Sequence, residues 1–82
     1  MANRDTILIV DDIEMNRAIL SELFKDKYRI LEADNGYDAV AIAEENNDKI
    51  AVILLDMIMP KKDGVETLRE LKDFGIKIGR AS

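Results

Sequence analysis

The 82-residue sequence predicts an α/β domain built on a small parallel sheet. Residues 6–10 and 50–55 are apolar without alternation and rich in β-branched side chains, as in strands that are covered on both faces. A helical pattern follows each of three strand patterns along the chain. Such strand–helix alternation is typical of parallel strands joined by right-handed crossovers.

The first strand and the first helix are predicted by a change of period. Residues 6–10 form a continuous apolar run. Beyond it, Met15, Ile19 and Leu23 recur every four residues, which predicts an amphipathic helix over 14–27.

The other elements have weaker patterns. Residues 28–33 alternate only in part, which predicts a shorter, more exposed strand at an edge of the sheet. Asn35-Gly36 is then a strand-to-helix turn, because the alanine-rich residues 39–45 favour a helix. The run 50–55 is the central strand. A third helix is predicted between Asp63 and Gly75, with an apolar stripe formed by Val65, Leu68 and Leu71.

The composition excludes several classes of function. The chain has no cysteine, which removes disulfides and thiolate metal sites and fits a reducing compartment. It has no histidine, so catalysis would depend on carboxylates, lysines or hydroxyls. The net charge of −5 argues against nucleic-acid binding through this domain and favours cations or basic partners. No apolar run approaches the roughly 20 residues that span a bilayer, so we expect a cytoplasmic domain without membrane contact.

Carboxylates follow two of the predicted strands. Asp11 and Asp12 follow the first strand, and Asp56 follows the central one. If these strands are neighbours, the acids meet at one edge, where open α/β sheets bind ligands. Clustered carboxylates repel each other unless a hard cation compensates, and Mg²⁺ suits oxygen ligands. A carboxylate beside Mg²⁺ can attack a phosphoryl group. Alternatively, the acids are unrelated caps and turns, and Asp11 with Glu14 resembles a capping box.

Several short motifs occur together in a specific order and spacing: Ile7-Leu8-Ile9-Val10-Asp11-Asp12, Asn16-Arg17, Asp34-Asn35-Gly36, Leu54-Leu55-Asp56-Met57-Ile58-Met59-Pro60 and Asp63-Gly64. In this combination residues 6–64 resemble the receiver domain of bacterial two-component response regulators. Asn16 and Arg17 lie at a helix start, near enough to the acids to tune a site there. A plain exposed helix surface is the alternative.

The resemblance implies roles for particular residues. Asp56 would be the phosphoacceptor, taking phosphate from a sensor histidine kinase or a phosphotransfer protein. Asp11, Asp12 and Asp56, with the backbone carbonyl of Ile58, would hold Mg²⁺. The chain would then be a signalling module rather than an enzyme, with no catalytic residue beyond Asp56.

The resemblance also implies a flavodoxin-like fold, here a partial (βα)₃ unit with strand order 2-1-3. The family's fourth strand, ending in Ser or Thr, and its fifth strand, with a Lys, have no counterpart; Lys61 and Lys77 do not match that Lys. We therefore expect one domain over 1–82, truncated after the third helix, with a receiver-like core at 6–75 and an irregular tail at 76–82.

Truncation would leave the central strand at an edge of the sheet. Residues 51–55 would then offer unpaired N–H and C=O groups, which recruit another strand. We expect two chains to pair through this strand about a two-fold axis and form a homodimer with a six-stranded sheet. In the alternative, residues 76–78 fold back and cover the same edge.

The sequence thus predicts a phosphoacceptor receiver module of a two-component phosphorelay, or a fragment of one, that binds Mg²⁺ and accepts phosphate on Asp56. The alternative is a self-associating structural or engineered half-domain without a functional switch. A stand-alone Mg²⁺-dependent phosphohydrolase is a third hypothesis, and it lacks an evident general base.

Overall fold

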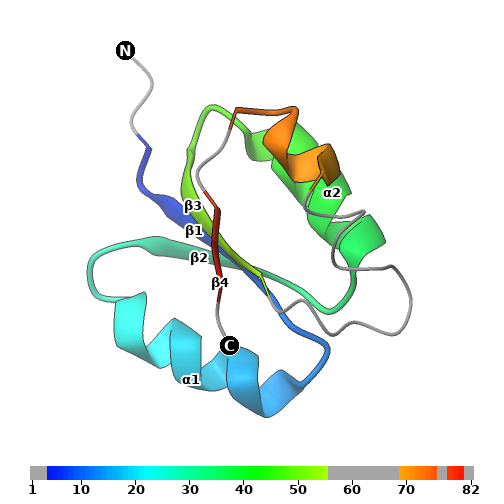
Figure 1. Ribbon diagram of the computed structural model, residues 1–82. Coiled ribbons are helices and arrows are strands. Elements are labelled where there is room, and N and C mark those ends of the chain that lie inside the picture. Colours follow the sequence, from blue (N-terminus) through cyan, green and yellow to red (C-terminus); the bar gives the residue numbers. More distant parts are fainter. Residues whose placement is uncertain (1–3, 56–68, 76–77, 81–82) are drawn as a thin grey trace.

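Four parallel strands form the sheet at the centre of the computed structural model, in the order β2-β1-β3-β4 (Figure 1). The structure describes residues 4–55, 69–75 and 78–80. The elements are β1 (Thr6–Val10), α1 (Glu14–Phe24), β2 (Arg29–Ala33), α2 (Gly36–Asn46), β3 (Ile50–Leu55) and β4 (Ile78–Arg80).

The predicted α/β fold class is confirmed, with the order 2-1-3 for the first three strands. β1 pairs in parallel with both β2 and β3. At the carboxyl end of the sheet Val10 is in register with Ala33 and with Leu55. The three strands therefore end level with one another, at the edge where the acidic residues follow.

We expect an irregular tail at 76–82, but part of the tail forms a strand. β4 pairs in parallel with Ile53–Leu55 of β3. The expectation that 51–55 forms an open edge is wrong for these three positions, because β4 supplies the backbone partners that an edge strand lacks. The alternative, a tail that covers this edge, is confirmed at residues 78–80, whereas residues 76 and 77 lie outside the described residues.

α2 packs closely on one face of the sheet (Figure 1). Its inward residues Ala39 and Ala43 are fully buried, so the helix approaches the strands without bulky side chains between them. Residues 69–72 are helical and lie beside α2 on the same side. The core on this face comprises Leu8, Val10, Ala33, Ala39, Ala43, Ile50, Ile53, Leu55 and Leu71.

α1 covers the opposite face of the sheet (Figure 1). Side chains alternate along a strand, so Ile7 and Ile9 of β1 point to this face, and both are buried. The predicted helix is confirmed, but it ends at Phe24 rather than at residue 27. No residue of α1 is fully buried.

The apolar stripe of α1 lies away from the sheet. Met15, Ile19 and Leu23 are 71%, 56% and 68% exposed. The half-buried apolar side chains of this helix are those of Leu20 and Phe24, on the adjacent part of the helix surface. The period predicted the helix correctly, but the side that packs depends on which neighbouring elements exist.

A membrane-spanning helix would have to be long and continuously apolar. None of the helices in the described ranges 4–55 and 69–75 meets that requirement.

Candidate functional site

The connection between β1 and α1 holds the first predicted acid rigidly. Asp11 is only 3% exposed. Its backbone N–H donates to the carbonyl of Ala33 at 3.1 Å, which continues the pairing with β2 beyond Val10. Its carboxylate Oδ1 accepts a hydrogen bond from the N–H of Ile13 at 2.9 Å. The strand end and the turn together therefore fix the direction of this carboxylate.

The capping-box alternative for Asp11 is wrong. The N-cap of α1 is Ile13, and no side chain caps it. Asp11 instead accepts from a residue two positions on, which is the Asx-turn arrangement typical of Asp ahead of a helix. The side chain thus has a structural contact through one oxygen, and among the described residues no hydrogen bond involves its second oxygen. Asp12 follows it and is exposed.

The two strands that precede the predicted acids are neighbours. Val10, just before Asp11, is paired with Leu55, the last residue of β3. Asp56 and Ile58, the predicted phosphoacceptor and carbonyl ligand, lie outside the described residues. Within the described part of the chain, no three acidic side chains form a metal centre by themselves. The carboxylate oxygens of Asp11 and Asp12 are ligands of the type that Mg²⁺ prefers. A complete Mg²⁺ site would need further ligands beside them.

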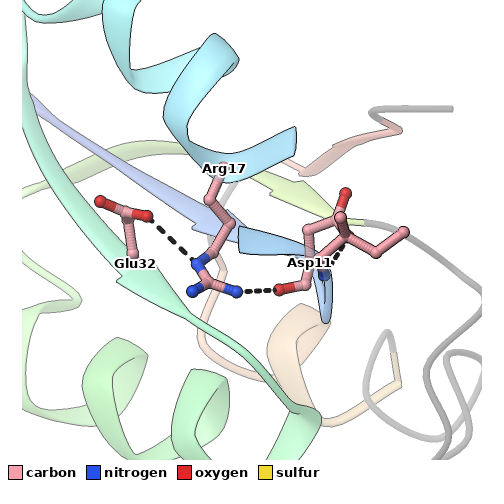
Figure 2. A network of polar contacts seen from close by, with 4 residues as sticks. Asp11, Arg17 and Glu32 are labelled. Carbon is pink, nitrogen blue, oxygen red and sulfur yellow. Dashed lines mark hydrogen bonds and ion pairs between the residues drawn. The ribbon is translucent and has the colours of Figure 1, made fainter. Parts of the chain in front are cut away.

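Arg17 is joined to the same connection (Figure 2). Its Nη1 donates to the backbone carbonyl of Asp11 at 2.7 Å, and its Nε donates to Oε1 of Glu32 at 3.1 Å. Its side chain is only 16% exposed. The alternative of a plain exposed helix surface is therefore wrong for Arg17, whereas Asn16 is exposed. The motif Asn16-Arg17 was the signal for this contact, but the sequence did not indicate its partners.

The motif Asp34-Asn35-Gly36 begins α2 and confirms the predicted strand-to-helix turn. Asn35 is the N-cap, and its side-chain oxygen accepts from the N–H of Asp38 at 2.9 Å. Its amide nitrogen donates to Asp34 at 2.6 Å and to Asp38 at 3.0 Å. These contacts account for the motif as a helix cap.

A pocket of about 360 Å³ lies beside the carboxyl end of β2. It does not include Asp11 or Asp12, so it is separate from the predicted acidic site. Arg17, which lines this pocket, also donates to the carbonyl of Asp11. The described residues that line it are Arg17, Glu32, Ala33, Asp34, Asp38, Ala41 and Ile42.

Comparison with known proteins gives a consistent result. The family model of the response regulator receiver domain matches residues 7–79. The chain is 36% identical over 69 residues to the chemotaxis protein CheY of Halobacterium salinarum, covering 83% of this chain and 56% of that protein.

Two solved structures are also similar. One is the response regulator protein TrrA of Thermotoga maritima in complex with Mg²⁺-BeF, with a TM-score of 0.78 and 32% identity, over 90% of this chain and 65% of that one. The other is the receiver domain of a Saccharomyces cerevisiae response regulator, crystallised with its histidine phosphotransfer signaling protein. The TM-score is 0.75 and the identity 33%, and the match covers 90% of this chain and 50% of that one.

The chain spans less than two-thirds of the length of each of these proteins. The family match nevertheless covers most of the chain, including both strands that lead to the predicted acids and the connection that holds Asp11. Sequence and strand order agree on one assignment. The chain belongs to the response regulator receiver domain family of two-component systems.

Proposed function

We propose that this receiver domain accepts a phosphoryl group on Asp56 and binds Mg²⁺ through Asp11, Asp12, Asp56 and the backbone carbonyl of Ile58. The observation that carries the proposal is the pairing of Val10 with Leu55, because each of these residues directly precedes a predicted acid. The similarity to a receiver crystallised with Mg²⁺-BeF supports the same chemistry.

In the proposed reaction a carboxylate oxygen of Asp56 attacks the phosphorus of a phosphohistidine on the donor protein. A P–O bond forms, the P–N bond breaks, and the imidazole leaves with the electron pair and is protonated by solvent. Mg²⁺, when bound, supplies neutralisation of charge on the phosphoryl oxygens. Asp11 contributes a carboxylate whose direction is preset by Ile13 N–H, so little reorganisation is needed there.

The donor that we propose is a sensor histidine kinase or a phosphotransfer protein. The similar yeast receiver domain was crystallised with a histidine phosphotransfer protein, which supports a partner of this class. The chain would act as an acceptor and not as a turnover enzyme. An aspartyl phosphate carries close to two negative charges and strong hydrogen-bond acceptors, which is enough to rearrange adjacent loops. The cytoplasmic location of the protein stays a prediction from its composition.

The direct test is the intact mass of the protein after incubation with a small phosphodonor and Mg²⁺. We expect one phosphoryl adduct on the wild type and none on Asp56→Asn, which removes the attacking oxygen. Circular dichroism on both proteins controls for folding. A folded wild type that binds Mg²⁺ but gains no mass would contradict phosphorylation and favour the alternative of a self-associating half-domain.

The alternative has one specific observation in its favour. The exposed apolar side chains of Met15, Ile19 and Leu23 on α1 offer a surface for association. The homodimer predicted through 51–55 is less favoured, because β4 occupies the edge of β3 at Ile53–Leu55.

A further inference from the structure

Arg17 connects three successive segments of the fold. It belongs to the first turns of α1, and its own N–H makes a helical hydrogen bond to Ile13 at 3.2 Å. Its guanidinium reaches the carbonyl of Asp11 in the β1–α1 connection and the carboxylate of Glu32 on β2 (Figure 2). One side chain therefore ties the connection that carries the acids to both the helix and the edge strand.

The carbonyl that Arg17 holds is a sensitive point of this connection. The peptide unit that joins Asp11 to Asp12 is planar, so fixing its carbonyl oxygen also fixes the orientation of the N–Cα bond of Asp12. Asp11 is held in addition at its N–H by Ala33 and at Oδ1 by Ile13. Of these contacts, the one from Arg17 is the shortest, at 2.7 Å. It is also made by a charged donor, which strengthens such bonds.

We propose that Arg17 is a positioning residue for the acidic site. By binding the carbonyl of Asp11, it sets the backbone from which Asp11 and Asp12 present their carboxylates to a divalent cation. This inference rests on the proposed function for the cation site and for the identity of the cation, Mg²⁺. The contact itself belongs to the described structure.

A guanidinium suits this role better than an ammonium. Its planar fork can serve two acceptors in a fixed geometry, whereas the lysine ammonium is a point charge on a flexible stem. Glu32 supplies the second acceptor and a compensating negative charge. Glu32 thus keeps the guanidinium plane of Arg17 oriented. Its negative charge also compensates the positive charge of Arg17, which lies beside the proposed Mg²⁺ site.

Charge and position predict opposite effects of removing Arg17. A positive charge near a cation site repels the cation, so loss of the charge alone would tighten Mg²⁺ binding. Loss of positioning would weaken it, because the carboxylates would have to be ordered when the cation binds. The sign of the change therefore decides between the two roles.

The test compares Arg17→Met with the control Arg29→Met in the full chain. Arg29 lies at the other end of β2, its side chain is 82% exposed, and its nearest acid, Asp5, is 3.7 Å away. Each variant removes one positive charge. Mg²⁺ affinity is measured by NMR titration, and stability without Mg²⁺ by urea unfolding. We expect Arg17→Met to bind Mg²⁺ about tenfold more weakly, as is typical when a residue supporting a metal ligand is lost. Arg29→Met should bind Mg²⁺ like the wild type.

A local measurement separates positioning from general destabilisation. Hydrogen exchange at the N–H of Ile13, which donates to Asp11, should accelerate in Arg17→Met. The matched control is the N–H of Asp38, which makes a side-chain bond of the same 2.9 Å length at the start of α2. It should be unchanged. Equal or tighter Mg²⁺ binding in Arg17→Met, with unchanged exchange at Ile13, would overturn the proposal.

Two further outcomes are informative. If Arg17→Met does not fold, Arg17→Lys carries the test, with an expected Mg²⁺ affinity below that of the wild type although the charge is retained. If the folded wild type shows no response to Mg²⁺, the proposed function fails. Exchange at Ile13 then still decides whether Arg17 positions the connection.

Discussion

At the scale of single residues, Asp11 makes a structural contact at the position for which we propose a role in Mg²⁺ binding. One carboxylate oxygen holds the N–H of Ile13, and the side chain lies at the strand end where the family resemblance implies a metal. An Asp at a strand exit can be a turn residue or a ligand. Here the turn contact fixes the direction of the carboxylate, so the two interpretations are compatible.

Substitutions at Asp11 should separate these roles. Asp11→Asn keeps an oxygen that can accept from Ile13 N–H, whereas Asp11→Ala leaves that N–H without its acceptor. We expect Asp11→Ala to be less stable than Asp11→Asn by about 1 kcal/mol in urea unfolding without Mg²⁺, the usual size of one intramolecular hydrogen bond. Both should lose stabilisation by Mg²⁺. Equal stabilities of the two variants would contradict the turn contact.

At the scale of elements, the two faces of the sheet differ in how completely they are covered. The α2 face has a closed core that includes Leu71, which is fully buried. The α1 face is covered by a helix with no fully buried residue. The free energy of burial should therefore be concentrated on the α2 side.

Two leucines test this difference. Leu71→Ala should lower the free energy of unfolding by about 2–5 kcal/mol, because it removes packed methyl groups and leaves a cavity. Leu23→Ala, at a position that is 68% exposed, should change it by no more than about 0.5 kcal/mol. Urea unfolding of the two variants beside the wild type measures both. A large loss in Leu23→Ala would mean that α1 packs against something in solution.

The elements also show how far the sequence could predict the fold. The continuous apolar runs predicted β1 and β3, and the alternation of strands and helices predicted a parallel sheet. The order β2-β1-β3 was implied by the family resemblance. Pairing of the tail with the edge of β3 was expected only as an alternative, because three residues, one of them glycine, form a strand only when an open edge is beside them. Likewise, the period of α1 could not show which side packs, since that depends on its neighbours.

The candidate site was predictable to a similar extent. Asp11 and Asp12 were predicted from their place after a strand, and the register of Val10 with Leu55 shows that the two strands preceding the predicted acids are neighbours. The contacts of Arg17 were missed, because its partners are set by the crossing of α1 over the strands and not by spacing along the chain.

At the scale of the whole molecule, β4 takes the position in which a second chain was expected. Its pairing with Ile53–Leu55 is intramolecular, so no second chain is needed to pair with the backbone of these three residues. Association through this edge would first require β4 to leave.

Removal of β4 should therefore change the oligomeric state. We expect a chain that ends at residue 77 to dimerise at concentrations at which the full chain is monomeric, because Ile53–Leu55 then lacks backbone partners. Light scattering over a concentration series measures this, with circular dichroism to confirm that both chains are folded. If the full chain is itself a dimer and the shortened chain is no more associated, the contact lies elsewhere, and α1 is the first surface to examine.

The central position of β1 also has a consequence for synthesis of the protein. β1 precedes every other element in the chain, yet it pairs with β2 and with β3, whose first residues are 29 and 50. During synthesis on a ribosome, the apolar side chains of β1 stay exposed until most of the domain has emerged. Only then can the other elements cover both faces and both edges of this strand. Nascent chains that stall before Leu55 should therefore depend on chaperones, because they expose a strand with no place to dock.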